Sequence, residues 1–231
     1  MIVAIHQPSY FPWLGLLHKI YKSDYFILMD EVQLADRAYQ HRNLFLSIQG
    51  KAHYLTIPFH KTGYRDKKIK DLLVYGNGWQ KSHEKFIRYN YKHSAYFDEI
   101  YGKLEAFYSK EYHFLLDALK ESMRISMDFF NIKTKLVQQS ELNYNTDSKK
   151  SDLILALVKS VGGNIYLSGT GAKDYLKDED FETAQISLIF NTFSHPVYQQ
   201  INSKEFIPGL ACLDVLFSLG IEKSRTLLGL I

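Results

Sequence analysis

The sequence is short of several features that mark particular classes of protein. It holds one cysteine, Cys212, in 231 residues, which rules out an intramolecular disulfide and is typical of a reducing compartment. No apolar run approaches the roughly 20 residues that a membrane-spanning helix needs. The start, MIVAIHQP, lacks the length and the basic segment of a signal peptide. We therefore expect a soluble, cytoplasmic protein with no membrane insertion.

A strong net charge and the common catalytic motifs are also lacking. The net charge of +3 gives no reason to expect a nucleic-acid partner. Paired cysteines and HExxH are missing, so we expect no metal site of those kinds. Because GxSxG is missing too, a serine hydrolase of the common α/β type is not expected. One local run, KTGYRDKKIK from Lys61 to Lys70, has five basic residues against Asp66. It predicts either a solvated loop or a segment that holds a phosphorylated ligand or partner.

Aromatic residues, in contrast, are abundant, with 17 Tyr and 15 Phe. Most lie at helical spacing, which favours a packing role, although some could stack on sugars or bases. The N-terminal region predicts a strand over Ile2–His6, a helix over Trp13–Tyr21 and a strand over Tyr25–Asp30. Strand, helix and strand within thirty residues predict a βαβ unit with parallel strands.

The rest of the chain predicts a mixture of strands and helices. Asp147 and Ser148 offer an N-cap for a helix that continues to Val161 and stops at Gly162. Other expected elements are an antiparallel hairpin of Leu44–Ile48 and His53–Ile57, mostly helical chain over Trp79–Phe130, strands at LVQQ, NIYLSG and ISLIF, and a last helix over about Leu210–Leu219. We predict a single α/β domain over residues 1–231. It has a mostly parallel sheet with flanking helices, the hairpin, and a helical insertion at about 78–131.

Polar residues follow three of the predicted strands. In open parallel sheets, ligands bind beyond the carboxyl ends of the strands, so three such clusters predict a binding site. The polar residues are His6 and Gln7 after the first strand, Asp30 and Gln33 after the second, and Ser168 and Gly169 after NIYL. The alternative is that His6 is a core histidine and Asp30 caps a turn.

The loop after the first strand is unusually rigid. Two of the five prolines, Pro8 and Pro12, fix its backbone, and Gly15 allows a close approach to a ligand. The helix that follows directs free N–H groups outward, an arrangement that suits phosphate. Tyr10 and Trp13 in this loop are candidates for stacking on a ring.

Further candidates lie outside these three strand ends. His195 and Tyr198 form another polar cluster, and His195 is a second candidate for proton transfer after His6. Arg42 could fork onto a phosphate, and Asn43 could bond a hydroxyl or acyl oxygen. His83 lies on the same predicted helix face as a tryptophan, where a core role and a role near the ligand are equally expected. Cys212 is interpreted as packing.

The chain resembles the WbqC-like proteins over nearly its full length. The residues that carry the resemblance are HQPSYFPWLGLLHKI, SDYFILMDEVQ, Arg42–Asn43, Trp79 with His83, LSGTGAKDYL, HPVYQQ and EFIPGLACLDVLFSLG. Ser9 stands where the family's pattern has Asn. The resemblance implies a role in bacterial surface-polysaccharide or O-antigen (lipopolysaccharide) biosynthesis. It also implies acyl or aminoacyl transfer, for example of glycine, to an amino sugar.

A weaker likeness connects the chain to nucleotidylyltransferase-like proteins. PWLGLLHKI is similar to the segment that carries their HxGH motif, but Trp13 and Leu16 replace both histidines. SGTGAKDYL matches the place of their phosphate loop, with Ser168, Gly169 and Lys173 as the implied phosphate contacts. The expected substrate is a UDP- or dTDP-linked amino-sugar nucleotide. The implied donor is an activated acyl or aminoacyl group, an aminoacyl-tRNA, or an acid activated by ATP.

Two other functions stay open on the sequence alone. One is an ATP-dependent ligase or nucleotidylyltransferase-like enzyme, which would bind ATP and release pyrophosphate. The other is a non-catalytic binding or scaffold protein in glycan assembly. The convergence of His, Asp, Gln and Arg favours an enzyme, with His6 as the base and Asp30 orienting the base or the sugar.

Overall fold

The computed structural model describes residues 1–35, 39–172 and 176–230, and these residues form two compact units. The sheet unit comprises Met1–Gln7, Gly15–Glu31 and Lys133–Ser194. The helical unit comprises Pro8–Leu14, Val32–Ile132 and His195–Ile231. The single domain expected from the sequence stays a prediction. No helix in the described part of the chain is long and apolar enough to cross a membrane.

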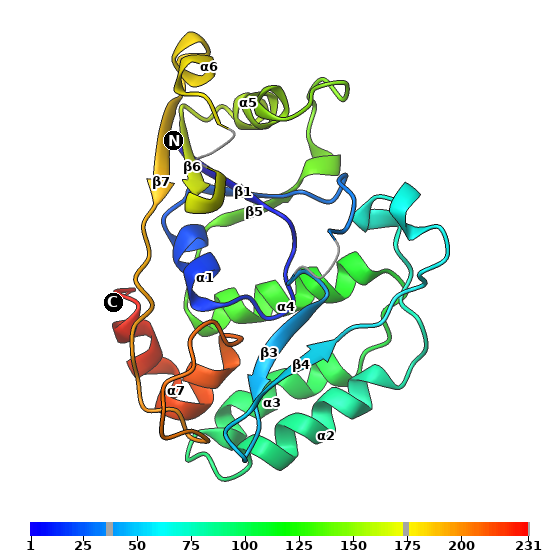
Figure 1. The fold of residues 1–231 in the computed structure, drawn as a ribbon, viewed down its shortest axis with the longest axis vertical. Helices are drawn as coiled ribbons and strands as arrows, with labels where there is room; N and C mark the ends of the chain where they lie inside the picture. Colours follow the sequence, from blue (N-terminus) through cyan, green and yellow to red (C-terminus); the bar gives the residue numbers. More distant parts are fainter. Residues whose placement is uncertain (36–38, 173–175, 231) are drawn as a thin grey trace. The chain divides into compact units, whose positions relative to one another are not determined.

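A five-stranded parallel sheet forms the frame of the sheet unit (Figure 1). Its spatial order is β5-β2-β1-β6-β7, and every neighbouring pair is parallel. The predicted α/β class and the βαβ start are therefore confirmed. The bounds are β1 Ile2–His6, β2 Tyr25–Leu28, β5 Lys135–Gln138, β6 Ile165–Gly169 and β7 Ser187–Asn191, with helices α1 Leu14–Tyr21, α5 Ser151–Ser160 and α6 Asp178–Thr183 and the 3₁₀ turns η3 Gln139–Glu141 and η4 Thr170–Ala172.

One face of the sheet carries the core of this unit. Val3 and Ile5 alternate along β1, so both side chains lie on the same face. They pack in one cluster with Leu157 of α5 and Phe181 of α6. Gly163 makes this packing feasible, because a Cβ at that position would lie 2.4 Å from Val3 Cγ2. The chain therefore needs glycine where α5 turns into β6.

The helical unit contains a two-stranded antiparallel sheet and four long helices. The predicted hairpin is confirmed, with both strands beginning slightly earlier than expected. The long helical stretch is also observed, divided into three helices. The bounds are β3 Arg42–Leu46, β4 Ala52–Thr56, α2 Trp79–Tyr91, α3 Phe97–Ser109, α4 Leu115–Phe129 and α7 Leu213–Leu227, with the 3₁₀ turns η1 Tyr64–Asp66 and η2 Ile69–Asp71.

One predicted helix end was wrong. The expected cap at Asp147–Ser148 is not used, because Asn145 forms the turn there and α5 begins only at Ser151. The last helix begins at Leu213, slightly later than expected, and its first segment ends at Leu219, as predicted. Gly220 breaks its regular geometry with a φ of 78°, and the chain then resumes helical turns. A glycine that usually ends a helix here joins two helical segments.

Candidate functional site

The order of the parallel strands places a switch point between β1 and β6. From β1 the chain adds β2 and β5 on one side, and it then returns to add β6 and β7 on the other. In open parallel sheets, ligands bind outside the carboxyl ends of the strands at such a reversal. The two strand ends at this point carry His6–Gln7 and Ser168–Gly169. The sheet unit therefore places two of the three predicted clusters at one edge, next to each other.

β1 and β6 part before β1 ends. Pairing with β6 stops at Ala4, whereas pairing with β2 continues to His6. The His6 carbonyl accepts the Met29 N–H on the β2 side, so the Ile5 carbonyl points toward the β6 side. There it accepts a hydrogen bond of 2.8 Å from the Lys19 ammonium of α1.

Lys19 is a residue of the site that sequence reasoning missed. Its exposed fraction is 5%, and burial lowers its pKa to about 8. A buried lysine without a carboxylate partner is costly, and perturbed lysines of this kind gather at functional sites. The signal was present in the sequence, since Lys19 stands among apolar residues of a short helix.

His6 is held in one tautomer. Its Nδ1 lies 2.8 Å from the Gln7 carbonyl oxygen, which can only accept, so Nδ1 carries the hydrogen. Desolvation by the surrounding protein, and then the charge of Lys19, lower its pKa to about 4, while the residue keeps exposed surface. At neutral pH the ring is therefore uncharged, with a lone pair on Nε2. This arrangement is that of a proton acceptor.

Asp30 has a structural partner that the sequence did not indicate. Its carboxylate accepts hydrogen bonds from the Ser140 N–H (3.0 Å) and the Ser140 hydroxyl (2.6 Å). Asp30 has no exposed surface, so it fastens the turn after β5 to the end of β2. Nearby, Glu31 accepts a hydrogen bond of 2.8 Å from the Tyr144 hydroxyl. The catalytic role predicted for Asp30 stays a prediction, and its observed contacts are those of a positioning residue.

The β6 and β7 ends complete the edge. Ser168 is buried, and its hydroxyl donates to the Gly169 carbonyl at 3.3 Å. His18, which the sequence reading did not select, lies 3.0 Å from the side chain of Asn191, measured from Nδ1 to Oδ1. Desolvation and then Lys22 lower the pKa of His18. The Gly15 carbonyl is 3.5 Å from the Asn191 amide. Lys173 lies outside the described residues.

The other predicted residues belong to the helical unit. Tyr10 and His83 are buried, and the Tyr10 hydroxyl lies 3.0 Å from His83 Nδ1. The Asn43 amide donates to the carbonyls of Tyr10 (3.1 Å) and Phe11 (2.8 Å), so it fixes the loop. The Arg42 guanidinium lies over a tyrosine ring at 4.3 Å. These contacts are all within the protein, and the ligand-binding roles stay predictions.

Trp13 and His195 are brought together within the helical unit. Their rings stack with centroids 6.4 Å apart, and Trp13 is 39% exposed. His195 Nδ1 lies 3.0 Å from the Pro196 carbonyl, which fixes its tautomer as Gln7 fixes that of His6. Tyr198 donates to the buried carboxylate of Asp214 at 2.8 Å, so it is anchored by its hydroxyl. The remaining predicted residue, Gln33, is exposed and pairs in a β-bridge with Lys68.

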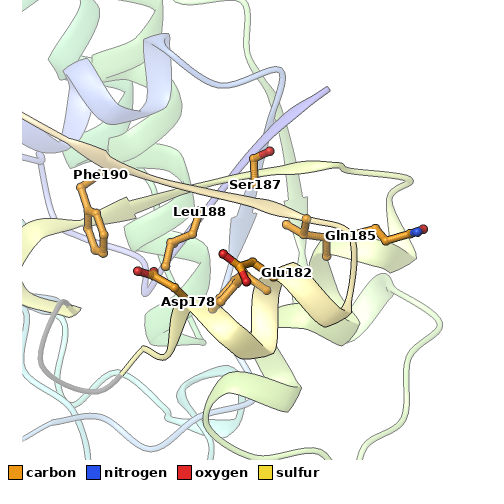
Figure 2. Close-up of a pocket in the computed structure, with 8 residues that line it drawn as sticks. Asp178, Glu182, Gln185, Ser187, Leu188 and Phe190 are labelled. Atoms are coloured by element: carbon orange, nitrogen blue, oxygen red, sulfur yellow. The ribbon is translucent and has the colours of Figure 1, made fainter.

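A separate hollow of about 650 Å³ lies beside α6 and β7 (Figure 2). α6 contributes Asp178 and Glu182, and β7 contributes Leu188 and Phe190. None of the residues predicted to bind a ligand lines it, so its size alone does not make it the site. Across the described residues, no group of three or more His, Cys, Asp or Glu side chains is arranged to hold a metal ion.

The fold defines an open parallel α/β protein, and its strand order gives a candidate ligand-binding edge at the switch point. The chain belongs to the WbqC-like protein family, whose sequence model matches residues 7–226. It is 29% identical over 222 residues to an uncharacterized protein, Rv1507c, of Mycobacterium tuberculosis (strain ATCC 25618 / H37Rv). That match covers 95% of this chain and 94% of the relative. No solved structure matches the chain.

Proposed function

We propose that the protein is a transferase that forms an amide on an amino-sugar nucleotide in surface-polysaccharide biosynthesis. The donor would be an activated acyl or aminoacyl group. The observation that carries the proposal is the fixed tautomer of His6 at the switch point, with its Nε2 lone pair available at neutral pH. An imidazole in this state accepts the proton that an amine must lose when it becomes an amide.

The proposed reaction does not require a strong base. The amine nitrogen attacks the donor carbonyl, a C–N bond forms, and the nitrogen becomes positively charged. Its proton is then acidic, so it can pass to His6 Nε2 even though the pKa of that ring is lowered to about 4. The bond from the carbonyl carbon to the leaving group breaks, and the proton returns from His6 to the leaving group.

The other residues of the edge have supporting roles in this proposal. Lys19 supplies positive charge near the end of β1, where it would favour a diphosphate or a developing oxyanion. Gln7 and Gly169 offer polar contacts at the ends of β1 and β6. Asp30 keeps the neighbouring turn in place through Ser140. Family membership supports the setting of the reaction without specifying its donor or acceptor.

The first test is ligand binding followed by turnover. The melting temperature of the protein is measured with ATP, with acyl and aminoacyl donors, and with UDP- and dTDP-linked amino sugars. Binding to the native state raises it by mass action. We expect a rise with an amino-sugar nucleotide, and amide formation by mass spectrometry once a donor is added.

The outcomes separate the alternatives. A rise with ATP alone, with pyrophosphate release, would replace the transferase by a ligase. No rise with any small molecule would favour a non-catalytic binding protein. Full turnover by a folded His6→Gln variant would remove His6 from the mechanism.

A further inference from the structure

A second hollow, of about 430 Å³, lies wholly within the helical unit. It stands where β4 ends and the basic segment Lys61–Lys70 begins, a segment that the proposed function does not use. Its volume falls within the usual range for small-molecule sites. The lining residues are His41, Thr56, Pro58, Phe59, His60, Lys61, Thr62 and Tyr75.

Backbone hydrogen bonds hold the walls of this hollow in place. The Ile57 N–H donates to the His41 carbonyl at 2.8 Å. The His60 N–H donates to the Leu73 carbonyl and the Tyr75 N–H to the Pro58 carbonyl, both at 3.0 Å. Main-chain pairing on both sides of residues 57–60 therefore forms the site before any ligand arrives, which reduces the entropic cost of binding.

The lining is basic and contains no carboxylate. His41, His60 and Lys61 are the residues of the lining that can carry positive charge, and both Arg42 and Lys61 act on His41 electrostatically. Desolvation first, and then these two cations, lower the pKa of His41 to about 4. Its Nδ1 is buried and has no hydrogen-bond partner among the described residues. An anion would relieve this accumulation of positive charge.

Flat rings form the apolar part of the same walls. The His41 ring meets Phe59 edge to face, with centroids 5.1 Å apart and planes at 90°. The His60 ring meets Tyr75 in the same way, at 5.1 Å and 86°. Tyr75 is 61% exposed, so its ring has free surface for another ring to stack on. Thr56 and Thr62 add hydroxyl groups that can donate to phosphate oxygens.

We propose that this hollow binds a phosphate ester attached to a flat ring, such as a nucleotide. Lys61 and the two histidines contact the phosphate, and Tyr75 stacks on the ring. The proposal does not depend on the transferase proposed above, because every residue that carries it belongs to the helical unit.

Calorimetric titration of the full chain with inorganic phosphate, uridine and uridine 5′-monophosphate tests both parts of the ligand. We expect the monophosphate to bind more tightly than either fragment and to weaken as salt is added. Lys61→Gln should weaken it about tenfold, the usual cost of losing a charged hydrogen bond. Tyr75→Ala should weaken it by roughly five- to tenfold, as expected for lost stacking.

Proton uptake on binding tests the role of His41 directly, because a residue that only supports the fold would not change it. Binding of the anion should protonate His41, so the apparent enthalpy at pH 6 should depend on the ionisation enthalpy of the buffer. His41→Gln should remove a proton from this uptake. Because the phosphate also titrates near pH 6, the difference between the two proteins isolates His41, and equal proton uptake by the unmodified chain and His41→Gln would overturn the role given to His41.

Two controls locate the binding. Lys85→Gln removes a lysine from a hollow of about 480 Å³ that also contains Glu84, so it should leave the affinity unchanged. An equal loss in Lys85→Gln and Lys61→Gln would mean non-specific attraction and overturn the proposal. Loss in His6→Gln with full affinity in Lys61→Gln would assign the nucleotide to the sheet edge, overturning this proposal while leaving the transferase in place. No binding of the monophosphate would also overturn it.

Discussion

The carboxyl edge of the sheet unit and the aromatic cluster of the helical unit each contain a histidine whose pKa is lowered to about 4. At the edge, His6 is exposed, and its Nδ1 bonds to the carbonyl of its neighbour Gln7. In the cluster, His83 is 4% exposed, and its Nδ1 meets the Tyr10 hydroxyl. A Thr56 backbone group also bonds to the His83 ring. The rings of Tyr10, Trp79 and Tyr108 surround it.

A lowered pKa does not by itself identify a catalytic histidine. Burial produces the same direction of shift in both residues, so the shift reports dry surroundings. The hydrogen bonds separate the two cases. The His83 ring bonds to both Tyr10 and Thr56, whereas the His6 ring bonds through Nδ1 to Gln7 and has no second hydrogen bond among the described residues. These contacts support the chemistry proposed for His6 and a packing role for His83.

The largest expected effect comes from exchanging each histidine for glutamine. If His6 is the base, His6→Gln should reduce amide formation by about 10²- to 10⁴-fold, the usual range for general acid–base catalysis. Its melting temperature should change little, because the hydrogen bond of the His6 ring is to the carbonyl of the next residue and ties no distant segment in place. Activity is measured by mass spectrometry of the product, and stability by thermal unfolding.

His83→Gln is the matched control and should show the opposite pattern. It removes a buried ring from a cluster of aromatic side chains, so the melting temperature should fall. The folded fraction should retain its turnover per molecule. If His83→Gln proved stable but inactive, the assignment of chemistry to His6 and packing to His83 would be reversed.

Some features of the candidate site at the carboxyl edge could be predicted from the sequence. β1 and the polar residues at its end follow from an apolar run that stops at His6, and the βαβ pattern indicates that strand ends share an edge. The buried state of Lys19 is harder to predict, because it depends on β1 and β6 parting after Ala4. No local pattern specifies where two strands separated by some 160 residues stop pairing.

The partners of the acidic residues were also beyond sequence reasoning. Asp30 meets Ser140, 110 residues later, and Asp214 meets Tyr91, 123 residues earlier. Residues this far apart are brought together by the fold, and a single sequence contains no record of the pairing. Local signals were sufficient at the end of the first segment of α7, which the sequence placed at about Leu219 and which Gly220 interrupts.

Within the helical unit, His83 and Asp214 are expected to change stability with pH in opposite directions. The pKa of His83 is about 4 in the folded protein and 6.5 when unfolded, so the unfolded state binds its proton first as the pH falls. The contribution of His83 to the free energy of unfolding should therefore be fully present above pH 6.5. It should decline toward pH 4, by about 3 kcal/mol in total.

Asp214 should act with the opposite sign. Burial raises its pKa from 3.8 to about 6, despite hydrogen bonds from Tyr198, Tyr91 and Gln200. Its contribution to stability is complete below pH 3.8 and is lost as the pH rises through 6. Urea unfolding at pH 4 to 7 checks both signs. His83→Gln should flatten the decline toward acid and Asp214→Asn should steepen it. Unchanged slopes in both variants would contradict the assignment.

The smallest expected effect tests whether Asp30 positions the edge or takes part in the reaction. Ser140→Ala removes the 2.6 Å hydroxyl bond to Asp30 and leaves the backbone N–H bond in place. Because Asp30 is fully buried, one of its oxygens loses its partner, which should cost about 1–2 kcal/mol of stability in urea unfolding. Ser160→Ala is the matched control without a carboxylate and should cost less. It removes the hydrogen bond of 2.7 Å from the Ser160 hydroxyl to the Leu157 carbonyl.

A positioning role for Asp30 predicts that Ser140→Ala lowers kcat/KM only a few-fold. A loss as large as that of His6→Gln would mean that Asp30 acts directly on the reacting groups, and the edge would then contain two catalytic residues.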